Sequence, residues 1–149
     1  MENRLRAVLD TNVLLRVILS RKSQGVAAAI WSLFKAGSFV LVSSESLLKE
    51  LKETLLVPEL SAIHTWSEEQ VDEFVESIRE LAAITPGTGV VEFRKLAERD
   101  ATDLAFLAAA LEGNASCIVS QDHDLLDTKN FKDISIIDPL AFLRILRSL

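Results

Sequence analysis

Carboxylate side chains that could bind a metal ion occur at four separated places along the chain. They are Asp10, Glu50, Asp103 with its neighbour Asp100, and Asp122 with Asp124. Each place lies beside the end of an expected strand or on an expected helix. Carboxylates that meet in one site repel one another unless a cation lies among them, and hard divalent ions prefer oxygen ligands. The pattern therefore predicts a divalent-metal site assembled from distant parts of the chain.

Each acid also has a purely structural interpretation. Asp10 follows a short apolar stretch and could equally be a turn or helix-capping residue, because Asp, Thr and Asn all favour helix starts. Glu50 lies at the margin of a leucine-lined helix face, where a glutamate is commonly a solvated surface charge. Asp100 is expected to cap the next helix, whereas Asp103 begins a helix of Leu, Ala and Phe and would need a partner there.

Polar residues also follow a later apolar stretch, at Ser120, Asp122 and Asp124. Asp122 is nearer the expected end of the strand and is therefore the better ligand candidate. Either acid could instead cap a short helical turn. Ser120 could orient one of these carboxylates or a metal-bound water.

Short apolar stretches alternate with amphipathic ones, which predicts strands alternating with helices. Strands are expected at residues 5–9, 39–42, 117–119 and 134–137, with a further short strand at 90–91. Helices are expected at residues 23–34, 44–55, 67–81, 102–111 and from 139 onward, and a loop at 85–89. This alternation predicts an α/β fold, a three-layer α/β/α sandwich with a central parallel sheet of four to five strands. Ligands of such sheets lie at the carboxyl ends of the strands.

The composition limits the classes of function. With 149 residues, 49% of them hydrophobic, the chain is long enough for one domain spanning residues 1–149. A formal charge of −6 argues against binding a polyanion through a broad positive surface. Cys117 is the only cysteine, which excludes an internal disulfide and favours a reducing, cytoplasmic setting. We expect no signal peptide, and no membrane span, because no apolar run reaches roughly 20 residues.

Five segments stand out when the chain is taken as a whole: Val8–Leu14, Leu47–Glu50, Arg99–Asp103, Ile118–Leu126 and Ile134–Leu143. They occur in the order typical of PIN domains, and the chain resembles this family over essentially its whole length. The last segment is similar to the end of the VapC-like toxins of type II toxin–antitoxin pairs. The resemblance implies a PIN-like three-layer fold and a ribonuclease that uses Mg²⁺ or Mn²⁺. It further implies an RNA substrate and an antitoxin protein as partner, and it is compatible with a homodimer.

Matched position by position, the resemblance also assigns site residues. The catalytic and metal-binding acids fall on Asp10, Glu50, Asp103 and Asp122, with Asp124 as an additional acid and Thr11, Asn12 and Ser120 as supporting polar residues. Two residues depart from the pattern. Gln121 stands where relatives often carry glycine or a basic residue, and Thr102 stands near the place of a further acid. Neither departure removes a main acid.

Basic residues follow the first expected strand at Arg16, Arg21 and Lys22. They could contact an RNA backbone near the mouth of the site. Solubilising surface charge is an equally good interpretation of the same residues. The sequence alone does not separate the two.

Two other functions stay open. An aspartate that accepts a phosphoryl group would also follow a first strand. A haloacid-dehalogenase phosphatase, however, would need a second aspartate where the chain has Asn12, and a response-regulator receiver would need adjacent acids before Asp10. A PIN-like domain that binds RNA or protein without cleaving is the closer alternative, because retained acids do not by themselves establish turnover.

Overall fold

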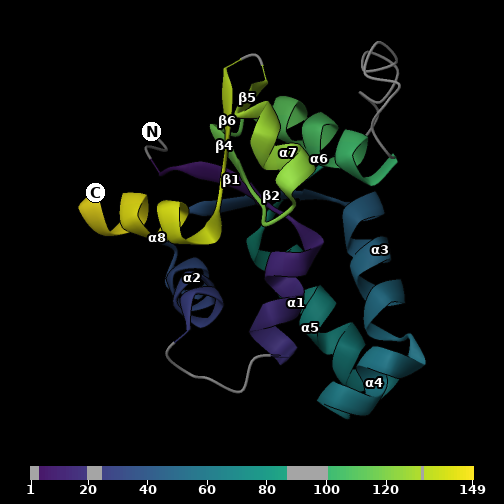
Figure 1. The fold of residues 1–149 in the computed structure, drawn as a ribbon. Coiled ribbons are helices and arrows are strands. Elements are labelled where there is room, and N and C mark those ends of the chain that lie inside the picture. The colour runs from purple at the N-terminus through teal and green to yellow at the C-terminus, as the bar shows by residue number, and fades with distance from the viewer. Residues whose placement is uncertain (1–3, 20–24, 87–100, 132) are drawn as a thin grey trace.

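The protein is an α/β sandwich in which one sheet lies between two layers of helices (Figure 1). The computed structural model describes residues 4–19, 25–86, 101–131 and 133–149, with the backbone alone described at 101–103, 124, 128 and 131. The strands are β1 (Arg6–Leu9), β2 (Val40–Ser44), β3 (Ala83–Thr85), β4 (Cys117–Val119), β5 (Asn130–Phe131) and β6 (Ile134–Ile137). The helices are α1 (Thr11–Leu19), α2 (Val26–Lys35), α3 (Glu45–Leu55), α4 (Pro58–His64), α5 (Glu68–Leu81), α6 (Ala101–Glu112), α7 (His123–Thr128) and α8 (Pro139–Ser148).

The strands run in the order β3-β2-β1-β4-β6-β5 across the sheet. The neighbouring strands β3, β2, β1, β4 and β6 run parallel to one another. Among the described strands, only β5 is antiparallel to its neighbour, β6. The expected α/β/α sandwich with a parallel sheet of four to five strands is thereby confirmed, and β5 adds a short antiparallel edge. Because β1 pairs with both β2 and β4, the residues that follow β1 and β4 meet at one edge of the sheet.

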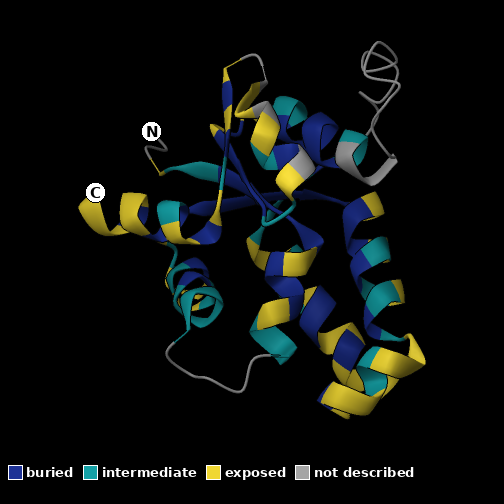
Figure 2. Ribbon diagram, viewed as in Figure 1, coloured by how far each residue is buried: buried dark blue, intermediate teal, exposed yellow. Residues whose placement is uncertain are grey.

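The two faces of the sheet contribute to separate hydrophobic cores. Successive side chains of a strand point to opposite faces, so Ala7 and Leu9 pack with α1, α2, α3, α5 and α8, whereas Val8 packs with α6 and α7. Both sets are almost completely buried (Figure 2). Helix α6 is buried along Phe106–Ala110, as expected for a helix with apolar residues on nearly every side. The sheet is therefore held rigidly from both sides, and its carboxyl edge is a fixed platform for side chains.

Local signals in the sequence account for the helix ends. Ser67 and Gln70 form the expected capping box at the start of α5, and the Ser44 hydroxyl accepts a hydrogen bond from the Leu47 N–H to cap α3. Pro58 occupies the first turn of α4, where its missing N–H has no consequence. Gly37 follows α2 with a φ of +78°, a left-handed conformation that favours glycine.

One sequence expectation is wrong, and another lies outside the described residues. Thr85, expected in a loop, instead ends β3, which pairs with β2 through Ala83, Ile84 and Thr85. The strand expected at residues 90–91 falls in the part of the chain that is not described. No helix in the described ranges combines the length and the apolar character needed to cross a bilayer.

Candidate active site

Asp10 lies at the carboxyl edge of the sheet, directly after β1. Its backbone N–H donates to the Val119 carbonyl at 2.9 Å, which extends the pairing of β1 with β4 by one residue. Its own carbonyl accepts from the Val13 N–H at 3.0 Å, so the chain turns at once into α1. The residue is buried, with 6% of its surface exposed. The strand end and the helix start together therefore fix a carboxylate in a buried position.

Hydrogen bonds from Ser120 and Asn12 hold this carboxylate. The Ser120 hydroxyl donates to Asp10 Oδ2 at 2.6 Å, and the Asn12 backbone N–H donates to Asp10 Oδ1 at 3.2 Å. Ser120 is fully buried, and its Oγ also accepts the Asp122 backbone N–H at 2.9 Å. A continuous chain of hydrogen bonds thus runs from Asp122 through Ser120 to Asp10, across 110 residues of sequence between the last two. We call these three residues the acid network.

The electrostatics of Asp10 reflect this setting. Burial raises the pKa of the Asp10 carboxyl above its ordinary value, and the negative charge of Asp122 raises it further. The hydrogen bonds from Ser120 and Asn12 lower the same pKa and offset part of the effect of burial. When Asp10 is ionised, its carboxylate is therefore poorly solvated and is repelled by the negative charge of Asp122. A nearby cation would relieve both the desolvation and the repulsion.

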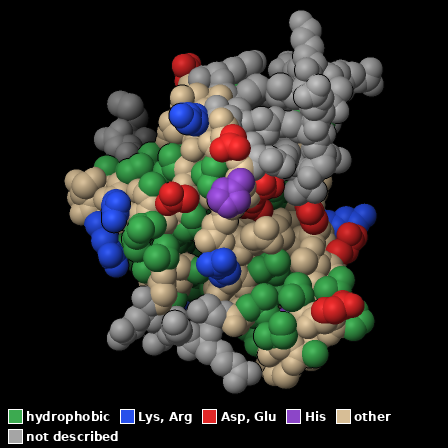
Figure 3. All heavy atoms as spheres, in the orientation of Figure 1, with side chains coloured by type: hydrophobic (Ala, Val, Ile, Leu, Met, Phe, Trp, Pro, Cys, Tyr) green, Lys and Arg blue, Asp and Glu red, His purple; other side chains and the backbone are tan. Residues whose placement is uncertain are grey.

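The chemistry of the donors fits a hard divalent ion. Asp10 and Asp122 offer carboxylate oxygens, the preferred ligands of Mg²⁺ and similar ions. Ser120 orients Asp10 in the way that polar neighbours orient metal-binding carboxylates. Acidic side chains and a histidine gather near the middle of this face of the molecule (Figure 3). The residues present are therefore suited to Mg²⁺ or Mn²⁺.

Glu50 lies on α3, on the margin between the buried and exposed sides of the helix. It is partly buried, whereas Leu47, Leu48 and Leu51 beside it are fully buried. Among the described side chains, no set of three or more His, Cys, Asp or Glu residues is close enough to hold one ion. The structure thus brings Asp10 and Asp122 together, and Glu50 stays a predicted third ligand.

Other predicted site residues lie partly or wholly outside the described structure. The backbone of Asp103 lies in the first turn of α6 and that of Asp124 in α7, but neither side chain is described. Asp100, Arg21 and Lys22 fall outside the described residues.

The remaining predicted polar residues surround the start of α1. Thr11 begins the helix and is buried, with 9% of its surface exposed. Asn12 is exposed and contacts Asp10 through its backbone N–H. Arg16 is exposed one turn further along α1. Asn12 therefore contacts Asp10 through its backbone N–H, a contact that the sequence did not predict.

Two potentially reactive side chains are not suited to catalysis. Burial raises the pKa of the Cys117 thiol to about 12, which disfavours the nucleophilic thiolate. Both ring nitrogens of His64 are engaged by backbone groups: Nε2 lies 2.8 Å from the Leu55 carbonyl oxygen, and Nδ1 accepts from the Trp66 N–H at 2.9 Å. His64 therefore connects α4 to the end of α3.

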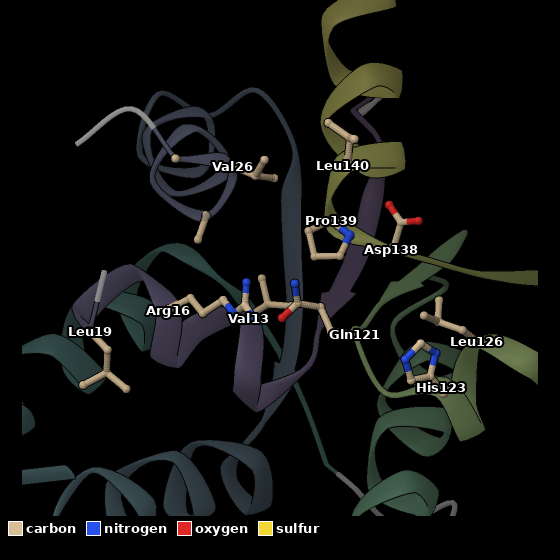
Figure 4. Close-up of a pocket in the computed structure, with 12 residues that line it drawn as sticks. Val13, Arg16, Leu19, Val26, Gln121, His123, Leu126, Asp138, Pro139 and Leu140 are labelled. Atoms are coloured by element: carbon tan, nitrogen blue, oxygen red, sulfur yellow. The ribbon is translucent and has the colours of Figure 1, made fainter. Parts of the chain in front are cut away.

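A pocket of about 830 Å³ opens beside the acid network, with Gln121, His123 and Asp138 in its lining (Figure 4). No pattern in the sequence links these side chains to a ligand. Gln121 is a departure from the family pattern, and Asp138 caps α8 by accepting the Ala141 N–H at 2.8 Å. The one available signal was the position of Gln121 and His123 on either side of Asp122.

Comparison with known proteins agrees with this architecture. A family model for the PIN domain matches residues 6–124. Among solved structures, PAE2754 from Pyrobaculum aerophilum is 14% identical with a TM-score of 0.65, over 97% of this chain and 91% of that chain. VapBC-1 from nontypeable Haemophilus influenzae is 18% identical with a TM-score of 0.60, over 91% of this chain and 99% of that chain. VapBC2 from Rickettsia felis, bound to a promoter DNA fragment, is 16% identical with a TM-score of 0.61, over 90% of this chain and 98% of that chain. No curated protein sequence matches the chain.

Proposed function

The chain belongs to the PIN-domain family, and from this premise we propose that it is a divalent-metal-dependent endoribonuclease. We propose further that it is the toxin of a toxin–antitoxin pair, with RNA as substrate and a cytoplasmic site of action. The observation that carries the proposal is the acid network. A buried Asp10 held by Ser120 beside Asp122 is costly for folding alone and useful for holding a cation.

The chain's own residues would act in distinct ways. Asp10 and Asp122, with Glu50 and Asp103, would hold Mg²⁺ or Mn²⁺ at the carboxyl edge of the sheet. Such an ion supplies Lewis-acid chemistry, which activates water and neutralises charge that develops on a phosphate. Ser120 orients Asp10 and the backbone of Asp122. Arg16, exposed on α1, would contact an RNA phosphate beside the site.

The proposed partner is an antitoxin protein. The similarity to VapBC2 and VapBC-1 supports this part of the proposal, together with the toxin-like end of the sequence at Ile134–Leu143. A homodimer is a further proposal. It would form from surfaces away from the acid network, so that both sites stay open to RNA.

Cleavage of a structured and an unstructured RNA, with Mg²⁺, Mn²⁺ or chelator, tests the enzyme directly. We expect cleavage with metal, none with chelator, and a loss of at least about 100-fold in Asp10→Asn, because removing a ligand acid leaves the ion under-coordinated. The matched control is Asp133→Asn, an exposed aspartate just before β6 at the opposite end of the strands. This control should cleave like the wild type.

The outcomes separate the candidate functions. Metal-dependent cleavage that survives in Asp10→Asn, with contaminating nuclease excluded, would contradict the proposed site. RNA binding without cleavage under any metal condition would favour a non-catalytic RNA-binding module instead. Co-expression with the product of a neighbouring reading frame should suppress the cleavage if that product is the antitoxin.

A further inference from the structure

The pocket beside the acid network joins the reacting edge of the sheet to an apolar surface. It lies between α1, α2, the turn at residues 121–123 and the start of α8. Its polar lining is Arg16, Gln121, His123 and Asp138, and Val26 and Leu140 are among its apolar residues. Figure 4 shows the Arg16 side chain directed toward Gln121, with His123 on the α7 side and Pro139 and Leu140 at the start of α8. A ligand that enters this pocket would therefore lie next to Asp122.

Three of the four polar side chains are available to a ligand. The Asp138 carboxylate caps α8 through the Ala141 N–H at 2.8 Å. No hydrogen bond or ion pair within the described part of the chain uses the side chains of Arg16, Gln121 or His123. These three are an amide with donors and an acceptor, an imidazole, and a guanidinium. The pocket thus combines apolar walls with hydrogen-bonding groups, two of which, Gln121 and His123, flank Asp122 in the chain.

This chemistry fits a nucleobase of single-stranded RNA. Sequence-specific recognition of RNA stacks unpaired bases on aromatic rings, including histidine, or on arginine guanidinium planes, and reads their edges by hydrogen bonds. A volume of about 830 Å³ exceeds the space that one nucleotide needs and lies within the range of small-molecule sites, roughly 300–1,000 Å³. A phosphodiester at the acids would leave the neighbouring base to lie over Val26 and Leu140, beside Gln121.

We propose that this pocket binds one unpaired base next to the scissile phosphate and that Gln121 reads its edge. The inference rests on the proposed ribonuclease function and adds a base-binding subsite that prefers one base at one position of the RNA. Gln121 is then a specificity-determining residue, His123 and Arg16 flank the base, and Val26 forms an apolar wall.

Binding measured without cleavage tests the pocket independently of catalysis. The probe is a fluorescein-labelled, nine-nucleotide single-stranded RNA in EDTA, compared with versions that carry one abasic position each. We expect one abasic position to weaken binding to the wild type by about tenfold, the order expected for loss of one base contact. Gln121→Ala should reduce the loss of affinity that this abasic position causes, because the variant no longer reads the edge of the base. Val26→Trp, which fills the pocket, should bind the parent RNA as weakly as the wild type binds that abasic RNA.

The matched control is Ser32→Trp, an exposed residue of the same helix that does not line the pocket, and it should bind like the wild type. Circular dichroism checks that each variant folds. If Val26→Trp does not fold, Gln121→Ala provides the test. The inference would be overturned by equal affinity for every abasic RNA, by unchanged binding in both Val26→Trp and Gln121→Ala, or by no RNA binding at all. So would a Val26→Trp protein that keeps RNA binding but loses a co-expressed protein partner, since the pocket would then hold polypeptide. Loss of metal-dependent cleavage with an intact abasic effect would instead contradict only the proposed catalysis.

Discussion

Ser120 is the residue on which the geometry of the candidate site depends. It is fully buried, its backbone N–H donates to the Ile137 carbonyl at 3.0 Å, and its hydroxyl serves Asp10 and Asp122 at once. A hydroxyl can donate one hydrogen bond and accept others, so one side chain satisfies a carboxylate and a backbone N–H. We therefore propose that Ser120 is a positioning residue, which would act on the predicted ligand Asp10 by fixing its orientation.

Replacing Ser120 by alanine should lower Mn²⁺ affinity and cleavage by about 10–100-fold, the range typical for loss of a group that orients a metal ligand. The expected cause is a misoriented Asp10, together with loss of the Ser120 hydroxyl that accepts the Asp122 N–H. Mn²⁺ affinity can be measured by calorimetry, which separates this role from a general loss of stability.

Ser116→Ala is a suitable control for that experiment. Ser116 precedes the amino end of the same strand and donates its hydroxyl to the Arg6 carbonyl at 3.2 Å, far from the acids. Its variant should bind Mn²⁺ normally. Normal Mn²⁺ affinity in Ser120→Ala would show that the hydroxyl has no positioning role.

At the scale of elements, the position of α6 depends on a close approach to the sheet. Gly113 follows α6, and a Cβ atom there would lie 2.3 Å from Val42 Cγ1 and 3.2 Å from Thr85 Cγ2. The Arg6 guanidinium also donates from Nε to the Gly113 carbonyl at 2.7 Å. Helix α6 carries Asp103 in its first turn. A change at its carboxyl end would therefore shift the helix that bears a predicted ligand.

Gly113→Ala should lower the free energy of unfolding by about 1–3 kcal/mol, the range for overpacking a tight core. Neither the backbone carbonyl of Ala109 at 3.1 Å nor the strand residue Val42 can move away freely. Urea denaturation measures the change. Asn114→Gly is the neighbouring control and should be neutral or slightly stabilising, because Asn114 has a φ of +53° that glycine adopts without strain. Wild-type stability in Gly113→Ala would mean that the packing is looser than described.

At the scale of the whole molecule, the candidate site lowers the stability of the metal-free protein. The chain has a net charge of −6, and burial together with Asp122 raises the pKa of Asp10 above its ordinary value of 3.8. A carboxyl whose pKa is raised in the folded state stabilises that state, and this contribution is fully present at pH values below the unfolded-state pKa. That contribution is lost as pH rises through the folded-state pKa. Ionisation of Asp10 near pH 7 is therefore expected to lower the free energy of unfolding, a cost that is common where a residue serves a site.

Asp10→Asn should therefore be more stable than the wild type in EDTA, by a margin that grows between pH 4 and pH 7. Mn²⁺ should reverse the order, because a ligand at 100 times its dissociation constant stabilises the folded wild type by about 2.7 kcal/mol. Thermal unfolding with and without Mn²⁺ measures both effects. Asp133→Asn should follow the wild type throughout. A margin independent of pH, or an equal gain from Mn²⁺ in Asp10→Asn, would contradict this account of the site.

Much of the fold could be predicted because its signals are local. The apolar strands β1, β2, β4 and β6, the capping box at Ser67 and the start of α8 at Pro139 all follow from neighbouring residues. Helix α1 was not among the expected helices. Its apolar residues cover most of its sides, so hydrophobic periodicity is weak evidence for a helix in this segment. Strand β3 was missed because three residues are too few to show alternation, and pairing with β2 supplies its stability.

The sequence by itself determined the α/β class, the parallel sheet and the identity of the candidate acids, because residue type and short-range pattern encode these. The tertiary structure alone decided that the Ser120 hydroxyl joins Asp10 to the Asp122 backbone, and that a pocket opens beside Gln121. Both depend on strand order, which places the ends of β1 and β4 side by side although they are more than a hundred residues apart. Contacts at such separation arise from packing of the whole chain, and no local pattern specifies them.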